Sequence, residues 1–172
     1  MIVWITGISG SGKTTIAKAL VKKLKPKIPH LFNVDGDEVR ELFGEDLGYT
    51  ERDRMIQIKR IQRLCHLLEK QNQVVIASAL YSNKDLLKWN RENFSEYYEI
   101  YLNAPLALVK ERDVKGLYKK YENGDEKNII GLDIPWHEPK NPDLKIDCSG
   151  DLSLDEVIQK IINLIPKFKE TL

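Results

Sequence analysis

The chain has 172 residues, of which 42% are hydrophobic and 31% are charged, and its formal net charge is +1. This length favours one domain spanning residues 1–172, and the composition is sufficient for a folded core. A charge so close to balance argues against a partner such as nucleic acid or a membrane surface that is bound through bulk positive charge. The apolar runs are too short to cross a membrane and no signal peptide is evident, so we expect a small cytoplasmic protein.

Short apolar runs alternate with amphipathic segments along the whole chain. The apolar runs predict strands at 2–6, 31–35, 74–79, 97–102 and 144–148. The amphipathic segments between and after them predict helices at 13–24, at 50–71, near 84–92 and from Pro105 to about 113, and a final helix that starts at Ser153. The alternation predicts an α/β fold with a parallel sheet. Capping boxes are expected at Thr50–Asp53 and Ser153–Glu156. The final helix is expected to bury Leu154, Val157, Ile158, Ile161, Ile162 and Ile165.

Residues 114–142 lack a regular pattern over about 29 residues, and loops beyond roughly 12–15 residues are usually functional or disordered. The charges and glycines of this stretch suit a lid that closes on phosphate groups. An ordinary surface excursion is the alternative. Cys65 and Cys148 lie far apart, which favours packed thiols over a disulfide or a zinc site.

A phosphate-binding loop follows the first strand. The residues from Gly7 to Thr14 read Gly-Ile-Ser-Gly-Ser-Gly-Lys-Thr and match G-x-x-x-x-G-K-[ST], directly before a predicted helix. In this arrangement backbone N–H groups surround a phosphate, Lys13 reaches the β- and γ-phosphates, and the Thr14 hydroxyl binds Mg²⁺. The motif therefore predicts that ATP or a related nucleotide binds here.

Two carboxylates follow the second strand, in Asp35-Gly36-Asp37. Many P-loop ATPases carry an Asp at the end of a buried strand, but the strand at 74–79 has Ser78 there. Asp35 and Asp37 can face the P-loop, where one would order Mg²⁺ and the other would receive a proton from a hydroxyl group. The alternative is a polar turn in which Asp37 caps a short helix at 38–42. The combination indicates a small-molecule kinase.

Several further motifs resemble the adenylylsulfate (APS) kinase family. They are Val-Asp-Gly-Asp-Glu-Val-Arg ending at Arg40, Asp-Leu-Gly-Tyr ending at Tyr49, Asp53-Arg54, Lys-Gly-Leu-Tyr-Lys-Lys at 115–120, Gly-Leu-Asp ending at Asp133, and Asn-Pro-Asp-Leu ending at Leu144. The resemblance implies a nucleoside-kinase-like P-loop NTPase fold, with three α/β/α layers around a five-stranded parallel sheet and a lid at 114–142. It also implies transfer of the ATP γ-phosphoryl group to a ribose 3′-hydroxyl, and a homodimer.

Carried over position by position, the resemblance implies three groups of site residues. The catalytic residues would be Lys13, Asp35 and Asp37, with Thr14 and Asp35 as the metal ligands. ATP would contact Gly7, Ser9, Gly10, Ser11, Gly12, Lys13, Thr14, Thr15 and Arg112. The acceptor nucleotide would contact Asp37, Arg40, Tyr49, Arg54, Gln57, Lys115, Leu117, Lys119 and Ile129. Without the family, surface salt bridges would be the default interpretation for Arg40, Arg54 and Lys119.

The chain departs from the family pattern at the acceptor contacts. Gln57 replaces an Asn that contacts the acceptor, Ile129 replaces a lid Phe that stacks on adenine, and the Ser-Pro element after the third strand is absent from 78–84. These departures favour a different acceptor, and the chain is similar to the cytidine diphosphoramidate kinases of bacterial capsule biosynthesis within this family. Adenylyl sulfate, as in sulfate assimilation, is the alternative acceptor. A nucleotide-binding regulatory module without activity is the alternative of another class.

Overall fold

The computed structural model describes residues 1–44, 46–113, 115–150 and 152–171. Its elements are β1 (Ile2–Thr6), α1 (Lys13–Leu24), β2 (Leu31–Asp35), α2 (Gly36–Leu42), α3 (Glu51–Lys70), β3 (Val74–Ala79), α4 (Lys84–Asn93), β4 (Tyr97–Asn103), α5 (Leu106–Arg112), α6 (Leu117–Glu122), β5 (Leu144–Asp147), α7 (Leu154–Leu164) and α8 (Pro166–Thr171). The five strands and the helices predicted at 13–24, 50–71, 84–92 and 105–113 agree with the sequence patterns to within a residue at each end.

The five strands form one sheet in the order β2-β3-β1-β4-β5. All neighbouring strands are parallel, and β1 lies in the centre, where every one of its residues is buried. A strand buried on both faces reads as a continuous apolar run rather than an alternating one, which is the pattern of Ile-Val-Trp-Ile at its start. The predicted parallel sheet is confirmed.

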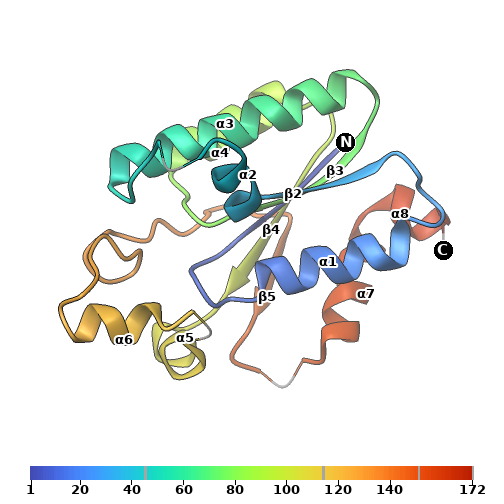
Figure 1. Cartoon of the computed structure of the whole chain (residues 1–172). Helices are drawn as coiled ribbons and strands as arrows, with labels where there is room; N and C mark the ends of the chain where they lie inside the picture. Colours follow the sequence, from blue (N-terminus) through green and yellow to red (C-terminus); the bar gives the residue numbers. More distant parts are fainter. Residues whose placement is uncertain (45, 114, 151, 172) are drawn as a thin grey trace.

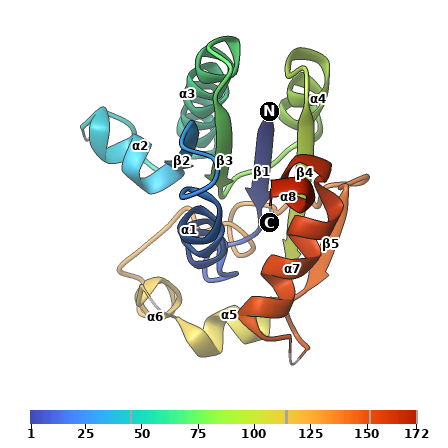
Figure 2. The same cartoon turned by 90° about the vertical axis from the view of Figure 1, so that its right-hand side faces the viewer.

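Helices cover both faces of the sheet, as Figures 1 and 2 show. Val3 and Ile5 of β1 point to the face covered by α1, α7 and α8, and they share one core cluster with those helices. Ile2 and Trp4 point to the opposite face, where they pack with side chains of α3 and α4. Successive strand residues alternate between faces, so one strand supplies both cores. The three-layer α/β/α architecture is confirmed.

The segment expected to form a lid contains more structure than its sequence pattern suggests. Its first residue, Val114, lies outside the described residues, but α6 follows at Leu117–Glu122. Asp113 stabilises the start of α6, because its carboxylate accepts hydrogen bonds from the N–H groups of Tyr118 (3.0 Å) and Lys119 (3.1 Å). A six-residue helix with one buried side chain is too short to show an apolar period. The expectation of an irregular segment was therefore wrong at α6.

The final helix is broken in two. Ile165 is extended (φ −102°, ψ 107°) because the ring of Pro166 disfavours helical backbone in the residue before it. The helix therefore ends at Leu164, and α8 begins at Pro166. The predicted burial is confirmed except at Leu154, which is 42% exposed in the first turn. Both predicted capping boxes, at Thr50–Asp53 and Ser153–Glu156, are confirmed.

Cys65 is buried and Cys148 half-buried, and both are free thiols, as expected. Within the ranges that the structure describes, no helix has both the length and the apolar character needed to cross a membrane.

Candidate active site

The loop between β1 and α1 surrounds the amino group of Lys13. Gly10 and Gly12 have positive φ angles of 80° and 97°, which reverse the loop without the strain that a side chain would cause. Lys13 Nζ donates hydrogen bonds to the carbonyl groups of Gly7 (2.8 Å) and Ile8 (2.9 Å). The cation therefore lies inside the loop, at the N-terminus of α1, where the helix dipole and unpaired N–H groups favour an anion.

Burial lowers the pKa of Lys13 from 10.5 to about 8. Asp37 and Asp35 raise this pKa and nearby Lys115 lowers it, but the loss of hydration dominates. The protein's own groups thus compensate the ammonium ion poorly. A phosphate group in the loop would restore the charged form, because a nearby opposite charge favours it.

Asp35, the last residue of β2, connects three elements. Its carboxylate accepts hydrogen bonds from the Thr14 hydroxyl (2.8 Å) and from the backbone N–H of Asp37 (2.9 Å). Asp35 therefore caps α2, a role that one interpretation of the sequence gave to Asp37. That interpretation was wrong because Asp35 has extended backbone and Asp37 already lies in the first helical turn. The carboxylate of Asp37 is left available for other contacts.

The residues Thr14 and Asp35 fit a magnesium ion. Hydroxyl and carboxylate oxygens are the hard ligands that Mg²⁺ prefers, and here two of them lie 2.8 Å apart beside the P-loop. No group of three or more His, Cys, Asp or Glu side chains in the described part of the chain could hold an ion by itself. Mg²⁺ typically uses one or two protein ligands and completes its shell with phosphates and water. The site therefore suits an ion that arrives with a nucleotide.

The carboxylate of Asp37 forms an ion pair with Lys115 from the lid segment, with 2.5 Å between Oδ2 and Nζ. Both side chains are mostly exposed, at 70% and 62%. An exposed pair contributes little to stability and separates easily. Lys115 is thus paired with the Asp37 carboxylate in a contact that does not fix its position.

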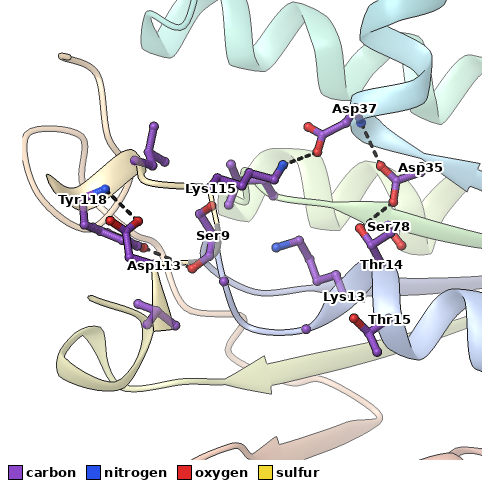
Figure 3. A pocket seen from close by; sticks show the side chains of 15 residues that line it. Ser9, Lys13, Thr14, Thr15, Asp35, Asp37, Ser78, Asp113, Lys115 and Tyr118 are labelled. Atoms are coloured by element: carbon purple, nitrogen blue, oxygen red, sulfur yellow. Dashed lines mark hydrogen bonds and ion pairs between the residues drawn. The ribbon is translucent and has the colours of Figure 1, made fainter. Parts of the chain in front are cut away.

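Figure 3 shows a pocket of about 170 Å³ between the P-loop, the ends of β2 and β3, and the lid. Ten of the predicted site residues line it, namely Ser9, Gly10, Gly12, Lys13, Thr14, Thr15, Asp35, Asp37, Lys115 and Leu117. Lys115 and Leu117 were expected at the acceptor, and they lie beside the P-loop instead. Tyr118 of α6 holds the lid here, since its hydroxyl donates to the Ser9 carbonyl at 3.1 Å.

A second cleft of about 330 Å³ lies on the other side of the P-loop. Ser11, Thr15 and Arg112 line it together with Cys148 and Leu152. Arg112 was expected near the adenine of ATP, and this cleft offers a cation beside an apolar wall. The cleft adjoins the phosphate loop, as one nucleotide spanning both would require.

Two arginines and Tyr49 form the wall of a third pocket. The guanidinium groups of Arg40 and Arg54 stack on the Tyr49 ring, 4.6 and 5.5 Å from its centroid. Arg54 also donates to the carbonyls of Tyr49 (3.0 Å) and Asn128 (2.7 Å), which ties α3 to the lid. Burial and the neighbouring Arg40 lower the pKa of Arg54. Two cations in partial burial favour an anionic ligand.

This third pocket is small. Its volume is about 60 Å³, and the predicted residues that line it are Asp37, Arg40, Tyr49, Arg54 and Gln57. Pockets that hold small-molecule ligands usually measure roughly 300–1,000 Å³. A whole nucleotide would therefore extend beyond this pocket or widen it.

Gln57 has a buried amide whose orientation is fixed. Its Nε2 donates to the Gly36 carbonyl at 3.0 Å, and a carbonyl can only accept. The Oε1 atom therefore faces the other way, and it has no hydrogen-bond partner among the described residues. A ligand in this pocket would satisfy Oε1 by presenting an N–H or O–H group.

Ile129 and Lys119 do not line the P-loop pocket, the cleft beside it or the arginine pocket. Ile129 is 2% exposed and packs in the core with Ile130 and Ile134, because an apolar side chain gains more from burial than from a polar pocket. Lys119 is exposed on α6. The packing of Ile129, Ile130 and Ile134 also places this part of the predicted lid segment against the core.

Sequence patterns missed Tyr81, which lines the third pocket together with Leu80. The Tyr81 ring is buried and its hydroxyl donates to Glu51 Oε1 at 2.6 Å. Burial and Glu51 raise its pKa to about 12, so the hydroxyl stays protonated. The available signal was an aromatic residue two positions after the end of a buried strand.

Comparisons with known proteins agree with this geometry. The family model described as adenylylsulphate kinase matches residues 1–147. An adenylyl-sulfate kinase of Gloeothece citriformis is 39% identical over 162 residues, covering 94% of this chain and 91% of the relative. One of Rippkaea orientalis is 41% identical over 160 residues, covering 92% and 87%. The solved structure of the Mycobacterium tuberculosis APS kinase in complex with AMPPNP and APS superimposes with a TM-score of 0.86, at 33% identity and 95% coverage of both chains.

Proposed function

Because the chain belongs to the adenylylsulphate kinase family, we propose that it transfers the γ-phosphoryl group of ATP to the 3′-hydroxyl group of adenylyl sulfate. Enzymes of this family are phosphotransferases that use ATP with Mg²⁺. The two relatives reported above are named adenylyl-sulfate kinases, and the match to this chain covers 91% and 87% of their lengths, which supports this acceptor. They lend no support to the cytidine diphosphoramidate that the sequence departures favoured.

The observation that carries the proposal is the place of Asp37. Its side chain lines both the P-loop pocket, with Lys13, and the arginine pocket, with Arg40 and Arg54. A carboxylate at this junction is in position to act between a phosphate donor in one pocket and an anionic acceptor in the other. A pure ATP-binding module would have no use for that junction.

The residues have distinct roles in the reaction. The acceptor hydroxyl oxygen forms a bond to the γ-phosphorus, the bond from that phosphorus to the β-γ bridging oxygen breaks, and ADP leaves with the electron pair. Asp37 receives the hydroxyl proton, for which Lys115 has to give up its ion pair with Asp37. Lys13 stabilises negative charge on the phosphates, and Thr14 and Asp35 would hold a Mg²⁺ ion, which would supply further positive charge there.

ADP release with purified protein, ATP and Mg²⁺ tests the proposal, with adenylyl sulfate and cytidine diphosphoramidate compared at equal concentration. We expect faster release with adenylyl sulfate and a 3′-phosphorylated product by phosphorus NMR. The Asp37→Asn variant is the control, which should bind ATP but lose turnover. ATP binding without release for either acceptor would indicate a nucleotide-binding module instead.

Cytidine diphosphoramidate is the second candidate acceptor, and Gln57 is the observation that favours it. Gln57 Oε1 can only accept a hydrogen bond, and a phosphoramidate nitrogen offers N–H donors where an ionised sulfate offers none. Ile129, which stands where the family has a stacking Phe, is buried and offers no ring to a large base. ADP release that is faster with the cytidine nucleotide than with adenylyl sulfate would establish this candidate, provided that the Gln57→Met variant loses this preference.

We expect either reaction to take place in the cytoplasm, where ATP is available.

A further inference from the structure

Ser78 is the one polar residue in β3, whose sequence is Val-Val-Ile-Ala-Ser-Ala. The residue is 3% exposed, and its hydroxyl makes no hydrogen bond to any described residue. Buried hydroxyl groups are nearly always hydrogen-bonded, because an unsatisfied one destabilises the fold. Alanine would be the expected residue here unless the hydroxyl serves a ligand.

The sheet register shows where this hydroxyl points. Ser78 is paired with Asp35 of β2 on one side and with Ile5 of β1 on the other. Ile76 and Val74, two and four residues earlier, pack in the core cluster that contains α1. Alternate strand residues share a face, so Ser78 also points to the α1 face.

Ser78 therefore lines the P-loop pocket, and Figure 3 shows it beside Thr14 and Asp35. The polar side chains of Thr14, Asp35 and Lys13 in this pocket already have partners. The Thr14 hydroxyl is bonded to Asp35, and the second oxygen of Asp35 accepts from the N–H of Asp37. Lys13 is bonded to loop carbonyls. The Ser78 hydroxyl is thus a third oxygen next to the two that fit Mg²⁺, and it is unpaired within the described residues.

We propose that Ser78 is a positioning residue for the Mg²⁺ ion that accompanies ATP, with its hydroxyl accepting a hydrogen bond from a water molecule of the ion's shell. Bound Mg²⁺ usually keeps several waters, and their protons need acceptors. Ser78 supplies a neutral acceptor at the strand end where many P-loop ATPases carry a carboxylate. The inference rests on the proposed ATP-dependent function and adds a residue to its metal site.

Calorimetric titration of ATP into the Ser78→Ala variant tests this role, at a series of Mg²⁺ concentrations and in EDTA. Ser82→Ala is the matched control, because Ser82 is 1% exposed, also has an unpartnered hydroxyl, and lines neither of the pockets described beside the P-loop and the arginines. Thermal unfolding without ligand is measured for both variants.

We expect Ser78→Ala to need roughly three- to tenfold more Mg²⁺ for half-maximal ATP binding, the size of one hydrogen bond, with its affinity in EDTA unchanged. Ser82→Ala should keep the wild-type Mg²⁺ dependence, and Ser78→Ala should unfold at no lower temperature than wild type. The role would be overturned if Ser78→Ala kept the wild-type Mg²⁺ dependence or lost as much ATP affinity in EDTA as in Mg²⁺. It would also be overturned if Ser78→Ala unfolded at a lower temperature than wild type. A wild-type protein that does not bind ATP would refute the proposed function and this inference with it.

Discussion

Lys13 carries a charge that the surrounding protein groups stabilise poorly. Burial lowers its pKa to about 8, close to physiological pH, whereas a lysine in water has a value of 10.5. Phosphate binding requires the ammonium form, so the two equilibria are linked. The residue therefore couples nucleotide affinity to pH.

We predict that ATP binding in EDTA weakens as the pH rises above about 8, by up to roughly tenfold per pH unit, because a growing fraction of Lys13 is neutral. Fluorescence or calorimetric titrations between pH 7 and 9.5 measure this. Lys13→Ala should bind ATP weakly with no such slope, keep its fold and lose turnover. Phosphoryl transfer undiminished in Lys13→Ala would contradict the role of the lysine.

Gly7 has a structural role that the P-loop motif does not reveal. A Cβ atom on this residue would lie 2.7 Å from the Leu102 carbonyl oxygen, and backbone in a central sheet cannot move away. Gly7→Ala should lower the free energy of unfolding by about 1–3 kcal/mol, the usual cost of overpacking. Gly150→Ala is the control, since a Cβ there meets nothing within 4 Å. Equal urea midpoints for the two variants would contradict the steric explanation.

At the scale of elements, α3 links stability to the arginine pocket. The capping box of Thr50 and Asp53 satisfies its first turn, and Arg54 and Gln57 follow within the next turn. Ser153 and Glu156 form a capping box at the start of α7, and the side chains of α7 line neither the P-loop pocket nor the arginine pocket. The two helices therefore provide a matched pair of caps.

Thr50→Ala and Ser153→Ala should each lower the free energy of unfolding by about 0.5–2 kcal/mol, because each removes a cap from an N-terminus. Only Thr50→Ala should also raise the KM for the acceptor, since fraying of the first turn of α3 displaces Arg54. Urea denaturation and steady-state kinetics measure the two effects. An equal rise in KM for Ser153→Ala would mean that the caps act through global stability alone.

At the scale of the whole molecule, a buried polar network connects α3, α4 and β4. Asn90, fully buried on α4, accepts from Gln62 of α3 (2.7 Å) and donates to the Tyr97 hydroxyl (3.0 Å). Tyr97 in turn donates to the buried carboxylate of Glu99 at 2.9 Å. Burial raises the pKa values of Tyr97 and Glu99. The network lies away from both pockets and holds the α3–α4 layer together.

Asn90→Ala should lower the free energy of unfolding by about 1–3 kcal/mol, because it leaves buried partners unsatisfied. The KM values for ATP and the acceptor should not change. Asn93→Ala on the same helix is the control, since Asn93 is exposed and bonds only to the Trp89 carbonyl in the described structure. A similar loss of unfolding free energy in both variants would contradict the importance of the network.

The homodimer implied by the family resemblance stays a prediction, and sedimentation equilibrium would measure it.

Much of the phosphate site could be predicted from local spacing. Lys13, Thr14 and Asp35 lie at fixed offsets from strand ends, so the elements themselves place them. The acceptor side was harder, because its wall combines α2, α3 and residues after β3. Ile129 was expected at the acceptor on the strength of family position, yet burial of an apolar side chain placed it in the core.

The sequence by itself determined the strands, the helices other than α6 and α8, the parallel sheet and the phosphate loop, since these depend on periodicity and on turn chemistry over a few neighbouring residues. Only the tertiary structure decided that Lys115 meets Asp37 across 78 positions, that Tyr118 holds the lid to Ser9, and that Ser78 stands unpaired beside Thr14. Contacts between distant segments depend on how the layers pack, and packing is a property of the whole chain. The net charge of +1 gave no hint that Lys13, Arg40 and Arg54 border adjoining pockets that share Asp37.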